Sequence, residues 1–315
     1  MKLLGVKMLM ITLAVILGFL MIIEGSLRLF LGLGKRPLYV ADPEIGYLLA
    51  PNQKMRRLGK TIILNQYSMR SAPIDKQRRD DHLRIFLLGD SIANGAWWTD
   101  QKETISALIA QTLVQVYGKE VEVLNASANS WGPRNQLAYL KRFGTFESQI
   151  IILLMNTDDF FATAPTSLPV GRDRYYPDRQ PLSAIGEIWE RFLAPSQPIP
   201  GMAEIMNEKG DRVGINLQAI KEIREIASQN QAQFFIALTP LKREVETQPR
   251  DYEQRARERL KKWALSQKIS LIDFLPIFQK NSKAAQLYRD SIHLSPLGNQ
   301  LVSEQISQLD FRLSK

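Results

Sequence analysis

Strand-like apolar runs alternate with amphipathic segments through most of the chain, and this alternation restricts the fold more than any other feature of the sequence. The apolar runs are short and lie at residues 83–88, 121–124, 150–155, 233–238 and 269–272. Apolar residues recur at helical spacing in residues 104–117, 136–143, 217–227, 252–265 and 296–309. Strands that alternate with helices form a parallel sheet with helices on both faces. The sequence therefore predicts a three-layer α/β/α sandwich around a central, parallel, five-stranded sheet.

The first segment of the chain is of a different kind. Residues 8–23 are apolar or only weakly polar throughout, and Lys2 and Lys7 precede them. Together with residues 3–6, the run reaches about the 20 residues that a helix needs to span a bilayer. No small-residue cleavage site follows it, which favours an uncleaved single-pass anchor in the cell membrane over a signal peptide. Basic residues flank both ends of the run, so charge alone leaves its orientation open.

These features divide the chain into three segments. Residues 1–34 form the anchor, residues 35–80 a turn-rich juxtamembrane neck, and residues 81–315 the main domain, which carries an irregular insertion at 162–200. Basic residues recur in the neck and suit a membrane surface. The alternative is a loosely packed neck in which one strand, residues 61–64, pairs with the main domain.

Composition narrows the classes of function. The chain has no cysteine, which excludes disulfides, thiol nucleophiles and cysteine metal sites. Its net charge of +9 suits an anionic partner such as phospholipid headgroups or an acidic polysaccharide, or is simply a solvated basic surface. Neither a nucleic-acid-binding motif nor a cluster of metal ligands is visible, so no nucleic acid, metal or cofactor is expected.

Residues capable of nucleophilic chemistry follow two of the predicted strands. Ligands bind at the carboxyl ends of parallel strands, and Ser91 follows the first strand there, although a helix N-cap serine is the alternative. A serine nucleophile needs a base, and the chain has two histidines. His82 precedes the first strand and lies at the wrong end of the sheet. His293 follows the fifth strand, and Asp290 is close enough in sequence for one turn to bring its carboxylate to the imidazole.

Two further polar loops follow the second and third strands. Residues 125–132 offer backbone N–H and side-chain amide donors, and residues 156–160 carry asparagine and aspartate at the same edge of the sheet. Turn and cap chemistry alone is the simpler interpretation of both loops. Because four loops converge at one edge, a shared site is favoured.

This arrangement resembles the SGNH/GDSL hydrolase superfamily, which is defined by separate sequence blocks. Residues 89–91 are similar to its first block, residues 125–132 to the second, residues 156–160 to the third and residues 290–293 to the last. Segments 42–47 and 65–70 are similar to membrane-tethered bacterial members related to polysaccharide O-acetyltransferase-type proteins. The resemblance covers most of residues 83–309 and implies a flavodoxin-like sandwich.

The resemblance implies a role for each candidate residue. Ser91 is expected to be the nucleophile, His293 the general base and Asp290 the carboxylate that orients it. The oxyanion hole is expected to use the backbone N–H groups of Ser91 and of Ser130, which replaces the glycine of the second block, with Asn156 as a side-chain donor.

The third block departs from the family pattern. Asp158 takes the place of its asparagine, and an ionised carboxylate there would repel an oxyanion. Asp90, Asn129 and Trp131 are expected to contact the substrate.

Aromatic and basic residues outside the blocks have two interpretations. Trp97 and Trp98 line a cleft or pack as a core pair. The insertion forms a rim for an anionic glycan or a structural cover over the sheet edge, and its residues of interest are Arg172, Arg174, Tyr175, Tyr176 and Arg179.

The function implied by the resemblance is hydrolysis of acyl esters, O-acetyl esters above all, through a Ser91 acyl-enzyme. The substrate would be an acylated carbohydrate or other ester of the envelope or the extracellular space, with the main domain on the outer side of the membrane. Two alternatives stay open: an O-acyltransferase to a polysaccharide that works with a membrane acyltransferase partner, and a non-catalytic glycan-binding protein that keeps the fold.

Overall fold

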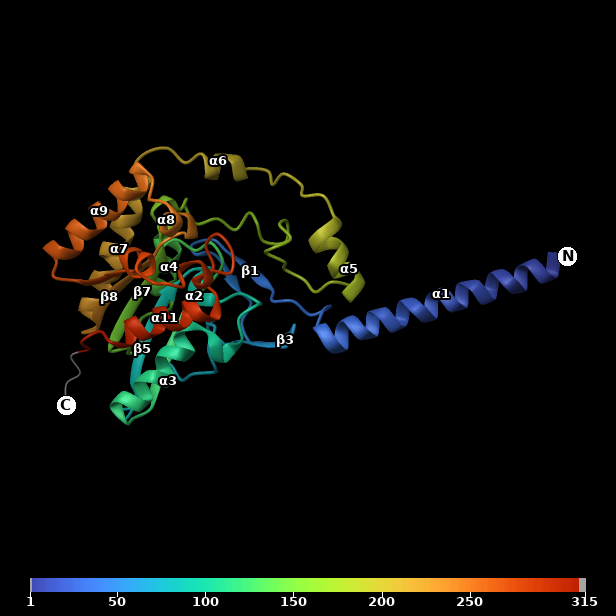
Figure 1. The fold of residues 1–315 in the computed structure, drawn as a ribbon, viewed down its shortest axis with the longest axis horizontal. Coiled ribbons are helices and arrows are strands. Elements are labelled where there is room, and N and C mark those ends of the chain that lie inside the picture. The colour runs from blue at the N-terminus through green and yellow to red at the C-terminus, as the bar shows by residue number, and fades with distance from the viewer. Residues whose placement is uncertain (1, 312–315) are drawn as a thin grey trace.

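The computed structural model describes residues 2–311, with side chains from Leu4 onward; residues 1 and 312–315 of the predicted anchor and main domain lie outside this range. A five-stranded parallel sheet with strand order β6-β5-β7-β8-β9 forms the centre (Figure 1). Its strands are β5 (Leu83–Gly89), β6 (Val121–Ser127), β7 (Ile150–Asn156), β8 (Gln233–Thr239) and β9 (Ser270–Asp273). The predicted sandwich and its sheet are confirmed.

Alternate residues of the central strands supply two separate cores, one on each face of the sheet. Phe86 and Leu153 belong to one core, and Ile85 and Ile152 to the other. The first core is covered by α4 (Pro133–Phe143), α7 (Arg212–Gln229) and α9 (Asp251–Ser266). The second is covered by α3 (Ile105–Tyr117), α10 (Phe274–Gln279) and α11 (Pro296–Ser307). Every residue of β5 and β7 is buried, and both strands are mostly apolar, although β5 also carries the buried Arg84.

The strand order determines where a ligand can bind. The chain runs from β5 to β6 on one side and then crosses to β7 on the other, so β5 lies between them. Such a reversal opens a crevice at the carboxyl ends of the strands. The short elements that follow these ends are α2 (Ser91–Asn94), η1 (Gln101–Glu103), η2 (Thr157–Phe161), α8 (Lys242–Glu246) and η4 (Ala284–Leu287).

The N-terminal apolar run forms a single long helix, α1 (Lys2–Leu31), which extends away from the rest of the molecule (Figure 1). Residues Leu4–Leu31 are long and apolar enough to cross a membrane, and their most apolar stretch is unburied. Length and composition therefore fit the predicted anchor, although a signal sequence has the same properties.

The neck folds into two antiparallel hairpins, β1 (Tyr39–Asp42) with β2 (Gly46–Leu49) and β3 (Gln53–Arg57) with β4 (Lys60–Leu64). The expectation that residues 61–64 pair with the main domain is wrong, because they pair with β3 instead. Leu58 and Gly59 both have positive φ, which is the geometry of a two-residue hairpin turn and keeps the pairing local.

The neck is not loosely packed either. Tyr39, Leu49 and Ile62 are buried in the same core as Phe86 of the central sheet. The insertion packs closely on it: Gly46 has a φ of 89°, and a Cβ there would lie 2.8 Å from the backbone nitrogen of Thr166. The insertion carries α5 (Ala184–Ile188) and the π-helical turn η3 (Trp189–Leu193), and α6 (Met202–Met206) follows it.

Candidate active site

Ser91 is the first residue of α2, directly after β5, and its side chain is nearly buried. The turn between strand and helix requires a glycine at position 89, since a Cβ there would lie 2.5 Å from the Ala93 Cβ and 3.0 Å from the Leu154 carbonyl oxygen. Asp90 caps the helix by accepting a hydrogen bond from the Ile92 N–H. The local sequence therefore places the serine hydroxyl at the carboxyl edge of the central strand.

Ser91, His293 and Asp290 form a continuous chain of hydrogen bonds. The Ser91 Oγ lies 3.0 Å from the His293 Nε2, and the His293 Nδ1 lies 2.8 Å from the Asp290 Oδ2. The backbone N–H groups of Ile292 and His293 also donate to the Asp290 Oδ1, at 3.0 and 2.8 Å. Partial burial works to raise the pKa of Asp290, but these hydrogen bonds and that of the imidazole outweigh it and lower the pKa. The carboxylate therefore stays ionised beside the imidazole.

Trp98 packs against the imidazole ring of His293. Its ring meets the His293 ring edge-on, with centroids 4.9 Å apart, and the Arg289 guanidinium lies over the same indole at 4.9 Å. Trp97 packs against Trp98 at 5.5 Å. Both tryptophans also line the pocket that contains Ser91, so they form a packed pair and a pocket wall at once.

Asp90 and Asn156 pair with each other beneath the nucleophile. The Asn156 Nδ2 donates to the Asp90 Oδ2 at 2.6 Å, and the Asn156 Oδ1 accepts the Asp158 N–H at 2.7 Å. Burial raises the pKa of Asp90 to about 6, although the Ile92 and Asn156 hydrogen bonds oppose the shift. Neither Asp90 nor Asn156 is among the residues that line the pocket. One amide N–H of Asn156 therefore holds the Asp90 carboxylate beside the nucleophile.

Two other predicted site residues also lie away from the pocket. Trp131 is 1% exposed and donates its Nε1–H to the Tyr47 carbonyl at 3.0 Å, so it serves the core and not the substrate. Burial, followed by repulsion from Glu253 and Glu244, raises the pKa of Asp158. This carboxyl group thus belongs to a cluster with residues of α8 and α9. Sequence spacing alone could not show which of these side chains face the pocket, because neighbouring residues of a tight turn point to different sides.

The second-block loop does reach the pocket, through Asn129 and Ser130. Ser130 has a φ of 56°, the left-handed conformation that a glycine adopts most easily. The Tyr176 hydroxyl donates to the Ser130 Oγ at 3.0 Å, and the Tyr47 hydroxyl donates to the Asn129 carbonyl at 2.6 Å. The loop is therefore fixed from both the neck and the insertion.

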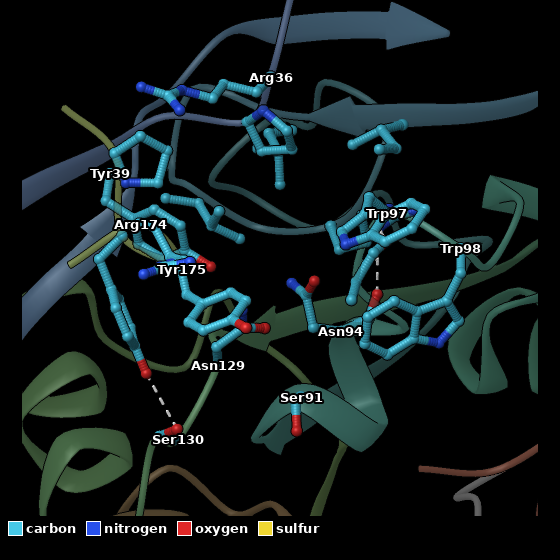
Figure 2. Close-up of a pocket in the computed structure, with 18 of the residues that line it drawn as sticks. Arg36, Tyr39, Ser91, Asn94, Trp97, Trp98, Asn129, Ser130, Arg174 and Tyr175 are labelled. Atoms are coloured by element: carbon cyan, nitrogen blue, oxygen red, sulfur yellow. Dashed lines mark hydrogen bonds between the residues drawn. The ribbon is translucent and has the colours of Figure 1, made fainter. Parts of the chain in front are cut away.

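The pocket is a cavity of about 300 Å³ whose walls come from the neck, the loops after β5 and β6, the insertion and His293. In Figure 2, Trp97 and Trp98 lie on one side of Ser91 and Arg174 and Tyr175 on the other. The neck and the loop after the nucleophile add residues that the sequence did not single out: Arg36, Tyr39, Leu49, Ile62, Leu64, Arg70 and Asn94. Two of these carried a signal: Asn94 lies one helical turn after Ser91, and Arg70 lies in segment 65–70, which resembles membrane-tethered family members.

Arg191 lines the pocket with a guanidinium that forms no ion pair within the described residues. Its guanidinium lies 4.5 Å from the Trp97 ring centroid, and within residues 2–311 its side chain has no hydrogen bond or ion pair. By contrast, Arg36 pairs with Glu190 at 2.9 Å, and Arg174 donates to backbone carbonyls. Burial, followed by repulsion from Arg57, lowers the pKa of Arg191. An anion bound beside Arg191 would favour its charged form and so oppose the lowering of its pKa by burial and by Arg57.

Comparison with known proteins shows the family to which the chain belongs. Residues 87–301, more than half of the chain, match the model of the GDSL-like Lipase/Acylhydrolase family. No curated protein is similar enough to count as a match. Similar solved structures include a lipolytic G-D-S-L protein of Veillonella parvula, with 15% identity, 73% of this chain and 99% of that chain covered, and a TM-score of 0.47. Another is a lipase/acylhydrolase of Enterococcus faecalis, with 17% identity, coverage of 71% and 93%, and a TM-score of 0.44. A psychrotrophic esterase of a Pseudoalteromonas species has 14% identity, coverage of 71% and 94%, and a TM-score of 0.43.

The match over residues 87–301 shows that the chain belongs to the GDSL-like lipase/acylhydrolase family of hydrolytic enzymes.

Proposed function

We propose that this protein hydrolyses acyl esters through a covalent Ser91 intermediate. The observation that carries the proposal is the hydrogen-bonded chain from Ser91 through His293 to Asp290 at the edge of the pocket. The His293 Nε2 takes the hydroxyl proton as the Ser91 Oγ attacks the ester carbonyl, and then delivers it to the leaving alcohol oxygen. Water, deprotonated by the same nitrogen, attacks the acyl-enzyme and releases the acid, and the serine recovers its proton.

The oxyanion hole in this proposal uses backbone donors. The Ser91 N–H lies at the start of α2, and Ser130 faces the same pocket in a left-handed turn. Ser130 stands where the family has a glycine, but this replacement keeps the donor, because the donor is the backbone N–H. Asn156 contributes by holding Asp90 beside the nucleophile through one of its two amide N–H groups.

The substrate class in this proposal is an acyl ester, above all an O-acetyl ester, of an anionic envelope glycan. Aromatic walls at Trp97, Trp98 and Tyr175 provide apolar faces suited to sugar rings, and Arg191 offers an unpaired guanidinium for an acidic group. With α1 in the cell membrane, the enzyme domain would act on the outer side, close to such polymers.

A fluorophosphonate probe tests the chemistry, because it reacts only with an activated serine. The full-length wild type is expected to be labelled, and the Ser91→Ala and His293→Ala variants are not. Ser282→Ala, which changes an exposed serine, is the matched control and should be labelled like the wild type. Labelling that persists in Ser91→Ala, or absence of labelling in folded wild type, contradicts the proposal.

Product analysis then separates hydrolysis from transfer. Incubation with an acetylated polysaccharide should release free acetate at a rate that an added acceptor glycan leaves unchanged. Appearance of acetylated acceptor in place of acetate would instead identify the protein as an O-acyltransferase. Glycan binding without either product would indicate a non-catalytic protein.

A further inference from the structure

Segment 182–193 of the insertion, which contains α5 and η3, exposes several large apolar side chains. Leu182 is 101% exposed, Trp189 59%, Phe192 67% and Leu193 63%. Trp189 and Phe192 or Leu193 recur at the spacing that places side chains on one side of a helix. Exposed apolar groups of this size, gathered on one element, mark an interaction site.

The opposite face of the same segment is firmly attached to the body of the protein. Ala184 and Glu187 are fully buried, and Arg191 faces the pocket. The Glu187 carboxylate forms a buried ion pair with Arg57 of the neck and accepts the Gly34 N–H at 2.6 Å. The exposed face is therefore held in a fixed direction and does not belong to a loose loop.

The segment is also joined to the long apolar helix α1. The Glu24 carboxylate accepts the backbone N–H groups of Ala184 at 2.7 Å and Ile185 at 3.0 Å, the first N–H groups of α5. Arg28 donates to the same carboxylate at 2.6 Å. Figure 1 shows α5 beside the inner end of α1, which agrees with these contacts.

The position of Glu24 along α1 sets the depth of this junction. Glu24 is the first charged residue after the apolar residues 8–23. Residues 3–23, which include Lys7 near their outer end, span about 31 Å at 1.5 Å per residue, close to the hydrocarbon thickness of a bilayer. If the run crosses a membrane, Glu24 lies at its boundary, and the start of α5 lies at the same level. Leu29 and Phe30, in the last turn of α1, are 79% and 74% exposed and extend the apolar surface there.

We propose that segment 182–193 rests in the interface of the bilayer that α1 crosses, with Leu182, Trp189 and Phe192 between the headgroups and the acyl chains. Tryptophan and phenylalanine on one face of a short helix suit this interface, and the partner is the lipid itself. Because Arg191 lies on the other face of the segment, one wall of the pocket would sit directly on the membrane surface. The inference depends on α1 being membrane-inserted and is independent of the chemistry at Ser91.

The absence of cysteine allows a direct test by single-site labelling. Phe192→Cys is labelled with an environment-sensitive fluorophore in the full-length protein, reconstituted in nanodiscs of phosphatidylcholine and phosphatidylglycerol, with or without nitroxide-labelled lipid. Leu265→Cys is the matched control, because Leu265 is an apolar residue 80% exposed on α9, which lies far from α1 (Figure 1). Phe19→Cys, 63% exposed on α1, reports insertion of the anchor.

The expected result is a blue-shifted emission at position 192 and quenching by shallow nitroxide lipid that exceeds the quenching at position 265 by roughly twofold or more. Position 19 should respond to nitroxides placed deep in the acyl region. Equal, water-like emission at positions 192 and 265 overturns the proposal, as does absence of quenching at position 19. A blue shift at 192 without lipid quenching also overturns it, because another protein copy would then cover the face.

Discussion

The Asn156 side chain donates to the Asp90 carboxylate at 2.6 Å and so joins the end of β7 to the residue that precedes the nucleophile. Asp90 is held on its other oxygen by the Ile92 N–H at 2.8 Å. Ser91 lies between these two attachments. The position of its hydroxyl therefore depends on a side chain that does not line the pocket.

Replacement of Asn156 by alanine should destabilise the protein and misplace Ser91. The change leaves a buried carboxylate without one donor, so we expect a loss of about 1–3 kcal/mol in the free energy of unfolding. Urea titration measures this loss, and ester turnover should fall with it. The control is Asp158→Asn, whose carboxyl group lies outside the pocket. A loss of turnover of about a hundredfold or more in Asp158→Asn would indicate an oxyanion-hole role and contradict the geometry.

The Asp290→Asn variant should keep the fold and lose most of its turnover. The amide can still accept from the Ile292 N–H, but it no longer stabilises the imidazolium that forms on His293. Losses of about 10²–10⁴-fold in kcat are expected for such a change. Asp80→Asn, at an exposed position before β5, serves as the control and should turn over ester like the wild type. Full turnover in Asp290→Asn would remove this carboxylate from the mechanism.

Asp90 should make the stability of the protein depend on pH. Burial raises its pKa from 3.8 to about 6 in the folded state, so folding favours the protonated form. Its contribution to stability is complete below about pH 4 and is lost as the pH rises through about 6. Asp90→Asn keeps an oxygen for the Ile92 N–H and removes the titration. We therefore expect the stability of wild type relative to this variant to fall between pH 4 and 7, measured by urea unfolding. A relative stability that rises over this range would contradict the raised pKa.

Arg191→Gln should weaken activity selectively towards anionic esters. A hydrogen bond to a charged group is worth about 1.5–3 kcal/mol, so kcat/KM for an acetylated acidic glycan should fall about tenfold or more. An uncharged acetyl ester should react at a nearly unchanged rate, because the variant leaves Ser91 and His293 intact. Arg172→Gln, an exposed change in the same insertion, controls for the loss of general positive charge. An equal fall for both substrates would show that Arg191 acts on the structure of the pocket instead.

Local pattern was enough to predict the sheet. Strands β5 and β7 are buried at every residue, so their sequences are dominated by apolar residues, and Arg84 in β5 does not obscure the pattern. The sequence also selected Ser91, Asp290 and His293, since residues after parallel strands share one edge of the sheet. The structure brings Ser91 and His293 to hydrogen-bond distance although they are 202 positions apart.

The sequence by itself therefore determined the layers of the fold, the apolar helix and the edge at which the chemistry is placed, because each depends on periodicity or on position after a strand. Only the tertiary structure decided which side chains face the pocket. Residues only two positions apart, such as Asn156 and Asp158, have different surroundings, and contacts such as Arg57 with Glu187 join segments 130 positions apart. The pocket walls from the neck and the insertion, and the apolar face beside α1, arise from such long-range packing. No pattern of neighbouring residues encodes that packing, because it depends on how whole elements dock.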